Sequence, residues 1–241
     1  MTISRYQFTF SWWLSVIFLL FLMLFSGLAI WQWDRAQQKL ALQQRIERMQ
    51  AMPPQTPIRL DGVEGEAHLP LAFKGHYLAD STFLLDNIVS NGKPGFYVMT
   101  AFGLDDQGTV ILVNRGWVPA LRHRETLPEI DTPQSPLALT GALMPPRSKP
   151  LVGGDLARPD LYVGGLWQYL DLSYLERQLG RPVFPWVLNL DPESISGYQR
   201  QWSSFDAKVG MHYGYFLYWL VFALFSVAAY LSLTIKKRSD D

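Results

Sequence analysis

The sequence predicts a membrane protein in which two transmembrane α-helices flank a β-rich (α+β) extracytoplasmic domain, built as an antiparallel sheet or a small barrel. Charge-free apolar runs lie at residues 12–31 and 213–235, and about 20 apolar residues are enough for a helix to cross a bilayer core. Between these runs, short apolar segments alternate with turn signals, as in an antiparallel sheet. With 49% hydrophobic and 14% aromatic residues, the chain is too apolar for a simple soluble domain.

The composition also excludes several classes of function. The formal net charge is +0, which argues against nucleic acid as a partner. The chain has no cysteine, so disulfides, thiolate metal sites and cysteine nucleophiles are absent. It contains no HExxH pair, nucleophile elbow, phosphate loop or dinucleotide fingerprint. His68, His76 and His123 show no metal-ligand spacing. We therefore expect no enzymatic activity.

The first apolar run is interpreted as a retained transmembrane helix at residues 12–32, preceded by an N-terminal tail at 1–11. A cleaved signal peptide is the alternative, but its apolar core would be shorter and would end at a small-x-small site. The run instead closes on Ala29-Ile30-Trp31. The leader is too short and too poor in arginine for a mitochondrial transit peptide, which favours a bacterial inner membrane.

Residues 33–211 are predicted to form one extracytoplasmic domain. Its first part, 33–52, has no Gly or Pro and should continue the first helix until Pro53-Pro54 stops it. One further helix is expected at a capping-box spacing, Ser173 to Glu176, with Gly180 as its stop. Strands are expected in the apolar segments that the turn signals separate. These segments are 68–77, 82–85, 96–102, 109–113, 137–143, 166–170 and 184–190, with turns at 91–92 and 106–108.

The second apolar run predicts a transmembrane helix at residues 213–235, followed by a short tail at 236–241. Basic residues favour the cytoplasmic side of a membrane, and Lys236, Lys237 and Arg238 follow this span directly. Both termini are then cytoplasmic and the main domain periplasmic. The first helix taken alone prefers the opposite orientation, because four basic residues follow it against a single one before it. These residues are Arg35, Lys39, Arg45 and Arg48 after the span and Arg5 before it.

His212 lies at the entrance of the second span. Helical spacing places it on one face with Tyr215, Phe216 and Trp219, so an imidazole heads an aromatic column. One interpretation is an interfacial anchor, since Tyr and Trp are common at bilayer surfaces. The other is a functional site, because ionisable residues at the edge of a spanning helix are costly. The residues around His212 leave both interpretations open.

Three local patterns together resemble the Surfeit locus protein family, membrane factors for the assembly of haem-copper terminal oxidases, in a bacterial member. The patterns are the exit of the first span (Gly27, Trp31, Gln32, Arg35), a central Asn-Arg-Gly-Trp-Val (residues 114–118) and the entry of the second span (His212, Tyr215, Trp219). The family commonly has a small residue and a polar residue where this chain has Phe216 and Tyr218. These bulkier side chains predict a narrower ligand pocket.

The resemblance implies that the protein binds haem a and promotes its insertion into subunit I of cytochrome c oxidase. His212 is the implied ligand of the haem iron, and imidazole suits that role. The expected partners are oxidase subunit I, the enzymes of haem a synthesis and the lipid bilayer. The expected cofactor-binding residues are His212, Tyr215, Trp219, Trp31, Gln32, Arg35 and Arg115.

Structural roles compete with several of these assignments. Trp31 and Arg35 together can form a cation–π anchor at the membrane surface, Gln32 can hydrogen-bond between helices, and Arg115 can serve the domain core. The alternative function is a cofactor-free membrane scaffold that holds oxidase subunits or other assembly factors.

Overall fold

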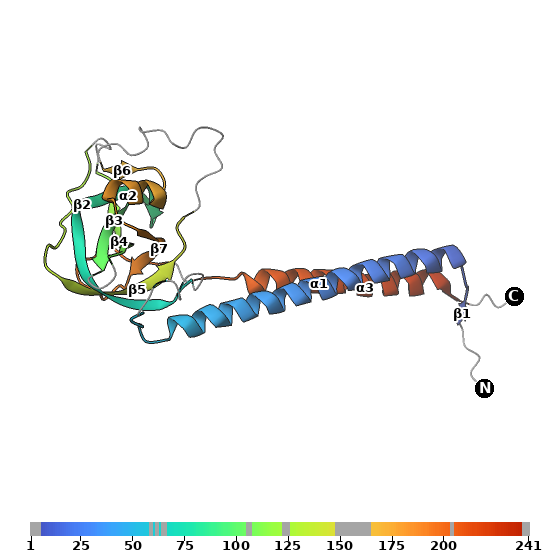
Figure 1. Cartoon of the computed structure of the whole chain (residues 1–241). Helices are drawn as coiled ribbons and strands as arrows, with labels where there is room; N and C mark the ends of the chain where they lie inside the picture. Colours follow the sequence, from blue (N-terminus) through green and yellow to red (C-terminus); the bar gives the residue numbers. More distant parts are fainter. Residues whose placement is uncertain are drawn as a thin grey trace. The chain divides into compact units, whose positions relative to one another are not determined.

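A computed structural model describes residues 6–57, 60, 63, 67–104, 108–121, 126–147, 165–202 and 205–237. The chain divides into two compact units. The first comprises Met1–Arg45 and Ser204–Asp241, and the second Ile46–Ser203. Figure 1 shows long helices in the first unit and the strands of a barrel in the second. Arg5, His123, Arg238 and the central residues of the turn expected at 106–108 lie outside the described residues.

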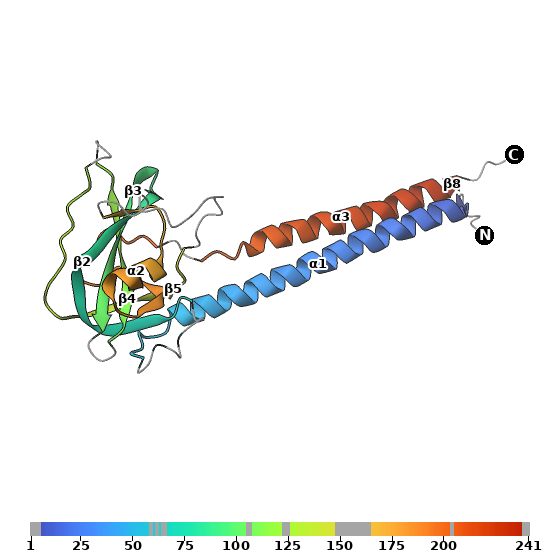
Figure 2. The same ribbon diagram turned by 45° about the horizontal axis from the view of Figure 1, so that its top comes forward.

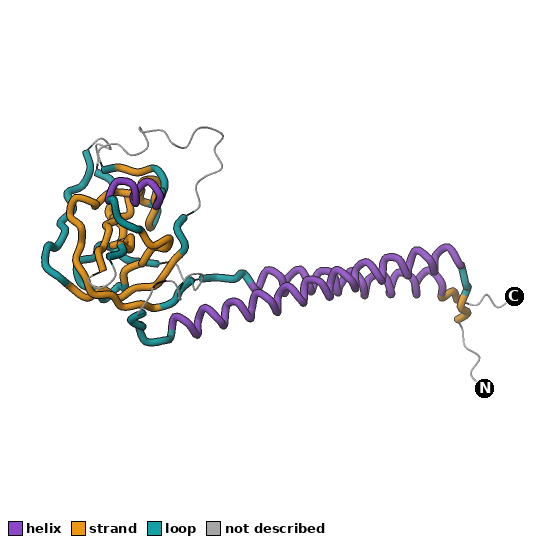
Figure 3. The backbone as a smooth tube through the Cα atoms, in the orientation of Figure 1, coloured by secondary structure: helices purple, strands orange, loops and turns teal. Residues whose placement is uncertain are grey.

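Two long helices make up most of the first unit. Helix α1 runs without interruption from Trp12–Gln50 and helix α3 from Val209–Thr234, as Figure 3 also shows. Both are long and apolar enough to cross a membrane. At 1.5 Å per residue, α1 is about 58 Å long, which exceeds a bilayer core of about 30 Å. Helix α1 therefore contains both the first span and the helical extension expected after it.

The two helices of this unit lie side by side and antiparallel (Figure 2). Phe18 stacks on Tyr230 with ring centroids 4.4 Å apart, and Phe25 stacks on Trp219 at 6.0 Å. The shielded positions recur at alternating spacings of three and four residues, which is the rhythm of a coiled-coil seam. On α1 they include Phe18, Leu22, Phe25, Ala29, Gln32 and Ala36, and on α3 His212, Phe216, Trp219, Ala223, Ser226 and Tyr230.

The helix pair is tied at both ends by contacts that the sequence did not predict. At one end, strand β1 (Tyr6–Phe8) pairs antiparallel with strand β8 (Ile235–Lys237). At the other end, the Gln43 amide donates to the Phe205 carbonyl and accepts from the Ala207 N–H, both at 2.9 Å. These ties fix how far α1 and α3 can slide along each other.

The second unit is a closed five-stranded barrel, which confirms the predicted fold class. Around the barrel the strands follow the order β3-β4-β7-β5-β2, and β2 closes it by pairing with β3. Most pairs are antiparallel, but β4–β7 is parallel, as is the short strand β6 beside β2. The strands are β2 (Pro70–Ser90), β3 (Lys93–Leu104), β4 (Val110–Pro119), β5 (Leu137–Met144), β6 (Leu166–Trp167) and β7 (Val183–Leu190).

The prediction of separate strands at 68–77 and 82–85 was wrong. Both segments belong to β2, whose pairing with β3 shifts register between Tyr77 and Thr82. Such an irregularity bends a strand without ending it, so β2 pairs with β5 through its first part and with β3 along most of its length. The segment predicted at 166–170 is a strand only at Leu166–Trp167.

Turn and cap residues explain where the other elements end. Asn91 and Gly92 have φ of 49° and 74°, as a two-residue hairpin loop between β2 and β3 requires. Helix α2 (Leu172–Leu179) is capped by Asp171, whose carboxylate accepts from the Tyr174 N–H at 2.9 Å. The capping box predicted from Ser173 was therefore wrong. The predicted stop at Gly180 is confirmed, since that residue is left-handed with φ of 61°.

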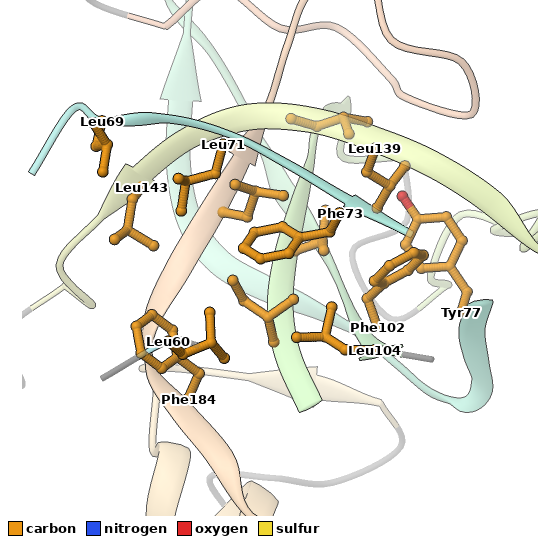
Figure 4. Close-up of a cluster of buried hydrophobic side chains, with 14 of the residues drawn as sticks. Leu60, Leu69, Leu71, Phe73, Tyr77, Phe102, Leu104, Leu139, Leu143 and Phe184 are labelled. Atoms are coloured by element: carbon orange, nitrogen blue, oxygen red, sulfur yellow. The ribbon is translucent and has the colours of Figure 1, made fainter. Parts of the chain in front are cut away.

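Both faces of the central strands are buried. Ile111 and Val113 of β4 belong to one apolar cluster, and Val110 and Leu112 belong to another. Figure 4 shows the first cluster, in which Leu71, Phe73, Leu139 and Leu143 converge from β2 and β5. The second cluster includes Leu175 of α2. Because strand side chains alternate between faces, β4 separates these two clusters.

Candidate functional site

The candidate site is a polar pair within the mainly apolar seam of the helix pair. His212 lies in the first turn of α3, and its Nδ1 is 2.9 Å from Oε1 of Gln32 on α1. Gln32 is only 8% exposed, so this hydrogen bond is shielded from water. Both residues occupy seam positions, where the antiparallel register brings them to the same level.

This hydrogen bond selects one form of the imidazole. An amide oxygen only accepts, so with Oε1 at this contact Nδ1 carries the proton and donates it. In the neutral ring the lone pair is then on Nε2, which is the form that binds a metal. Among the described residues nothing hydrogen-bonds to Nε2. Partners on the second nitrogen commonly orient metal-binding histidines, and Gln32 is placed to do so here.

Aromatic contacts between α1 and α3 occur along the same stretch of the helix pair. Trp219 is half-buried and stacks on Phe25. Trp33 of α1 packs against Tyr213 at 5.7 Å and against Phe216 at 5.3 Å between ring centroids. Sequence reasoning missed Trp33 and Tyr213 as partners, although each directly follows a member of the polar pair. These contacts join Trp33, Tyr213 and Phe216 in one aromatic group across the two helices.

Three of the expected residues lie on exposed surfaces of the helix pair. Trp31 is 52% exposed and Tyr215 47% exposed. Arg35 is exposed, and its guanidinium donates to Gln38 Oε1 at 3.1 Å. Tyr218, which was expected to narrow the site, is 65% exposed. The seam thus brings together His212, Gln32 and Trp219, whereas Trp31, Arg35 and Tyr215 lie outside it.

Arg115 lies in the barrel unit and is only 2% exposed. Its guanidinium donates to the backbone carbonyls of Ser196 at 2.9 Å and Asp131 at 2.7 Å, and to Thr132 Oγ1 at 3.1 Å. It also lies 4.9 Å from the ring centroid of Tyr77. These contacts engage the guanidinium within the barrel and favour the structural role, so we do not include Arg115 in the candidate site.

His212 alone suits a metal ion whose other ligands come from a cofactor and not from the protein. Within the described residues, no group of three or more His, Cys, Asp or Glu side chains is placed to hold a metal ion. A haem needs only one or two axial ligands from the protein, because the macrocycle supplies four nitrogens. One oriented imidazole beside aromatic rings therefore fits a haem better than it fits a bare ion.

Comparison with known proteins identifies the family. Residues 19–224 match the SURF1 family, a range that includes Gln32, Arg115 and His212. The chain belongs to the SURF1 family. This confirms the resemblance to the family that the sequence motifs predicted, whereas the bacterial origin stays a prediction.

Curated relatives of this SURF1-family chain come from several animals. Surfeit locus protein 1 of Rattus norvegicus is 30% identical over 179 residues, or 66% of this chain and 56% of the rat protein. A SURF1-like protein of Caenorhabditis elegans is 22% identical over 69% of this chain and 57% of its own length. The Xenopus tropicalis protein is 29% identical over 64% and 54% respectively. The chain thus spans little more than half the length of these relatives.

Family membership supports two further predictions. The SURF1-family chain is a membrane protein with two candidate transmembrane helices, as expected from its two apolar runs. The assembly factors of the SURF1 family are non-enzymatic, in agreement with the absence of a catalytic signature in the sequence.

Proposed function

We propose that this SURF1-family protein assists the assembly of cytochrome c oxidase by holding haem a at His212 and promoting its insertion into subunit I. Its partners are then oxidase subunit I, the enzymes of haem a synthesis and the lipid bilayer. The observation that carries the proposal is the hydrogen bond between His212 Nδ1 and Gln32 Oε1. The protein acts as a membrane chaperone for the cofactor and catalyses no reaction.

In this proposal the polar pair and the aromatic residues of α3 have different roles. Gln32 holds the proton on Nδ1 and so keeps the Nε2 lone pair of His212 available. Bound haem a supplies an iron with axial positions and a flat apolar macrocycle. Tyr215 and Trp219 offer rings about one and two helical turns along α3 from His212, where they would contact such a macrocycle.

The exposed residues Arg35 and Trp31 suit the propionate-bearing edge of haem a. The Arg35 guanidinium is exposed and suits propionate groups through charge-assisted hydrogen bonds. Trp31 exposes its indole beside Gln32. A group held on the side of a helix pair stays accessible to a second protein, which favours transient holding and transfer over permanent storage.

We further propose that the protein is a multi-pass protein of a bacterial inner membrane. Both termini are cytoplasmic and the barrel domain is periplasmic. Lys236 and Lys237 support this orientation because they follow α3 directly, and basic residues favour the cytoplasmic side. His212, at the opposite end of α3, then lies near the periplasmic surface of the bilayer.

Co-expression with the haem a synthesis enzymes tests the cofactor assignment. The purified wild-type protein should show a haem a spectrum, and His212→Ala should lose most of it. His76→Ala, which changes a histidine of the barrel strand β2, serves as the matched control and should retain the haem. A wild-type protein without haem, or unchanged haem content in His212→Ala, contradicts the proposal.

The second candidate is a cofactor-free scaffold for oxidase subunits or other assembly factors. Two apolar side chains of the barrel unit favour it, because Val89 is 69% exposed and Ile195 is 68% exposed. Such side chains can pack against a partner protein, although single exposed apolar residues are also common on surfaces that bind nothing. A scaffold predicts that His212→Ala preserves oxidase assembly while Val89→Asp or Ile195→Asp impairs it.

A further inference from the structure

The barrel unit contains a cavity that the haem proposal does not use. Its volume is about 520 Å³. Each of the five barrel strands contributes to its wall, with Leu85 from β2, Met99 from β3, Asn114 from β4, Ala142 from β5 and Val187 from β7. Small-molecule sites usually measure roughly 300–1,000 Å³. The cavity is thus large enough for a compact organic ligand.

Part of the cavity wall is apolar and rigid. Leu85, Met99, Leu170 and Val187 line the cavity and are buried members of the second core cluster. Packed core side chains keep one arrangement, so this part of the wall is preformed. It suits the apolar body of a ligand.

Two asparagines belong to the same wall. Asn114 of β4 and Asn189 of β7 are partners in the parallel strand register, and both line the cavity. Asn114 is 5% exposed, and its Oδ1 accepts from the Gly116 N–H at 3.2 Å. Among the described residues, neither amide nitrogen has a hydrogen-bond partner. Neither nitrogen is a fully buried atom without a partner, so both donors are accessible and are suited to oxygen atoms of a ligand.

Aromatic rings and charged groups complete the cavity. The Arg147 guanidinium lies 5.7 Å from the ring centroid of Tyr97, and Tyr97 lies 5.8 Å from Trp202 at an interplanar angle of 58°. All three residues line the cavity, as does Asp191. Arg147 is exposed and has no carboxylate partner among the described residues. The wall therefore combines π faces, one cation and one anion.

We propose that this cavity binds a small aromatic molecule that carries a carboxylate and a hydroxyl or amino group. Tyr97 and Trp202 contact the aromatic body, and Arg147 pairs with the carboxylate. Asn114 and Asn189 donate to ligand oxygens, and Asp191 accepts from the hydroxyl or amino group. The site lies entirely in the barrel unit and is independent of the haem proposal.

Methionine methyl NMR on the full-length protein in lipid nanodiscs provides a local readout, with indole-3-lactate as the probe. Met99 and Met144 line the cavity, whereas Met23 lies in α1 and is 64% exposed. Saturable shifts of the Met99 and Met144 methyl signals are expected. The absence of saturable shifts, or shifts at Met23 alone from partitioning into the bilayer, overturns the proposal.

Two matched substitutions test the assigned chemistry. Arg147→Met should weaken indole-3-lactate binding about tenfold, because a charge-assisted hydrogen bond is lost. Arg177→Met is the control, since this guanidinium lies 5.9 Å from the Tyr174 ring and does not line the cavity. It should leave the affinity unchanged. Equal affinities in the two variants would mean that Arg147 does not bind the carboxylate and would overturn the assignment.

Discussion

The hydrogen bond between Gln32 and His212 makes a specific prediction about Gln32→Leu. The substitution removes the acceptor 2.9 Å from Nδ1 and leaves a shielded N–H without a partner. Leaving such a donor unsatisfied costs about 1–3 kcal/mol. Loss of the residue that orients a metal ligand typically weakens metal binding about 10–100-fold. We expect Gln32→Leu to raise the Kd for haem a by a factor in this range.

Gln37→Leu is the matched control for this experiment. The Gln37 amide donates to Tyr213 Oη at 3.0 Å, so the control also removes one hydrogen bond between α1 and α3. Hydrogen bonds between membrane helices average about 0.6 kcal/mol, so loss of the exposed Gln37 bond should weaken the helix pairing only slightly. Only Gln32→Leu removes a contact to His212, so only this variant should lose haem.

The assay compares haem content and haem titration of wild type, both glutamine variants and His212→Ala in the same nanodiscs. Near-ultraviolet circular dichroism reports whether the aromatic contacts of the helix pair persist. Equal haem loss in Gln32→Leu and Gln37→Leu would show that helix pairing in general, and not the imidazole contact, controls binding. Wild-type affinity in Gln32→Leu would refute the orienting role of Gln32.

Three further predictions concern the barrel unit. Among the described residues the buried Tyr77 hydroxyl has no hydrogen-bond partner, and burial raises the pKa of Tyr77 above 10.0, with partial opposition from the Arg115 charge. Tyr77→Phe should therefore leave the free energy of unfolding unchanged or raise it by up to about 1 kcal/mol, and should reduce the loss of stability as the pH rises above 10, in denaturant titrations. A clear destabilisation contradicts this. Burial lowers the pKa of His68 below 6.5, so the unfolded chain takes up the proton first and stability falls as the pH drops through 6.5. Asparagine tolerates the backbone φ of 70° at this position, so His68→Asn should reduce the fall of the melting temperature with falling pH. An unchanged slope of melting temperature against pH would reject the role of His68. Arg115→Lys should lower the free energy of unfolding by about 2–4 kcal/mol, because an ammonium cannot reproduce the forked contacts to two carbonyls and a hydroxyl. Unfolding within error of wild type would show those contacts to be dispensable.

Hydrophobic patterning was sufficient to predict the large elements of the fold. It was insufficient for the long strand β2 and for the short β1–β8 pair. The two apolar runs specify helices by length alone, and the Asn91-Gly92 turn specifies a hairpin by its backbone conformation. Strand β2 was divided because the polar Asp80 and Ser81 interrupt its apolar pattern, whereas the structure accommodates them at a register shift. The β1–β8 pair has three residues in each strand, too few for a periodicity to show.

The sequence predicted which residues lie near His212, but it did not predict which of them face α1. Helical spacing places both Tyr215 and Phe216 near the His212 face, because positions three and four residues on are both adjacent. The seam against α1 selects Phe216 and leaves Tyr215 47% exposed. Gln32 was among the expected cofactor-binding residues, and the antiparallel register pairs it with His212. That register depends on contacts between segments far apart in sequence.

The two ties of the helix pair make the site sensitive to chain length. The paired strands β1 and β8 hold one end. The two hydrogen bonds of Gln43 to Phe205 and Ala207 hold the other. Each residue of an α-helix turns the chain by about 100°. If the Gln43 hydrogen bonds to Phe205 and Ala207 are kept, a single residue inserted into α1 between Gln32 and Gln43 would therefore rotate Gln32 out of the seam. The number of residues between Gln32 and Gln43 therefore determines whether His212 has its partner.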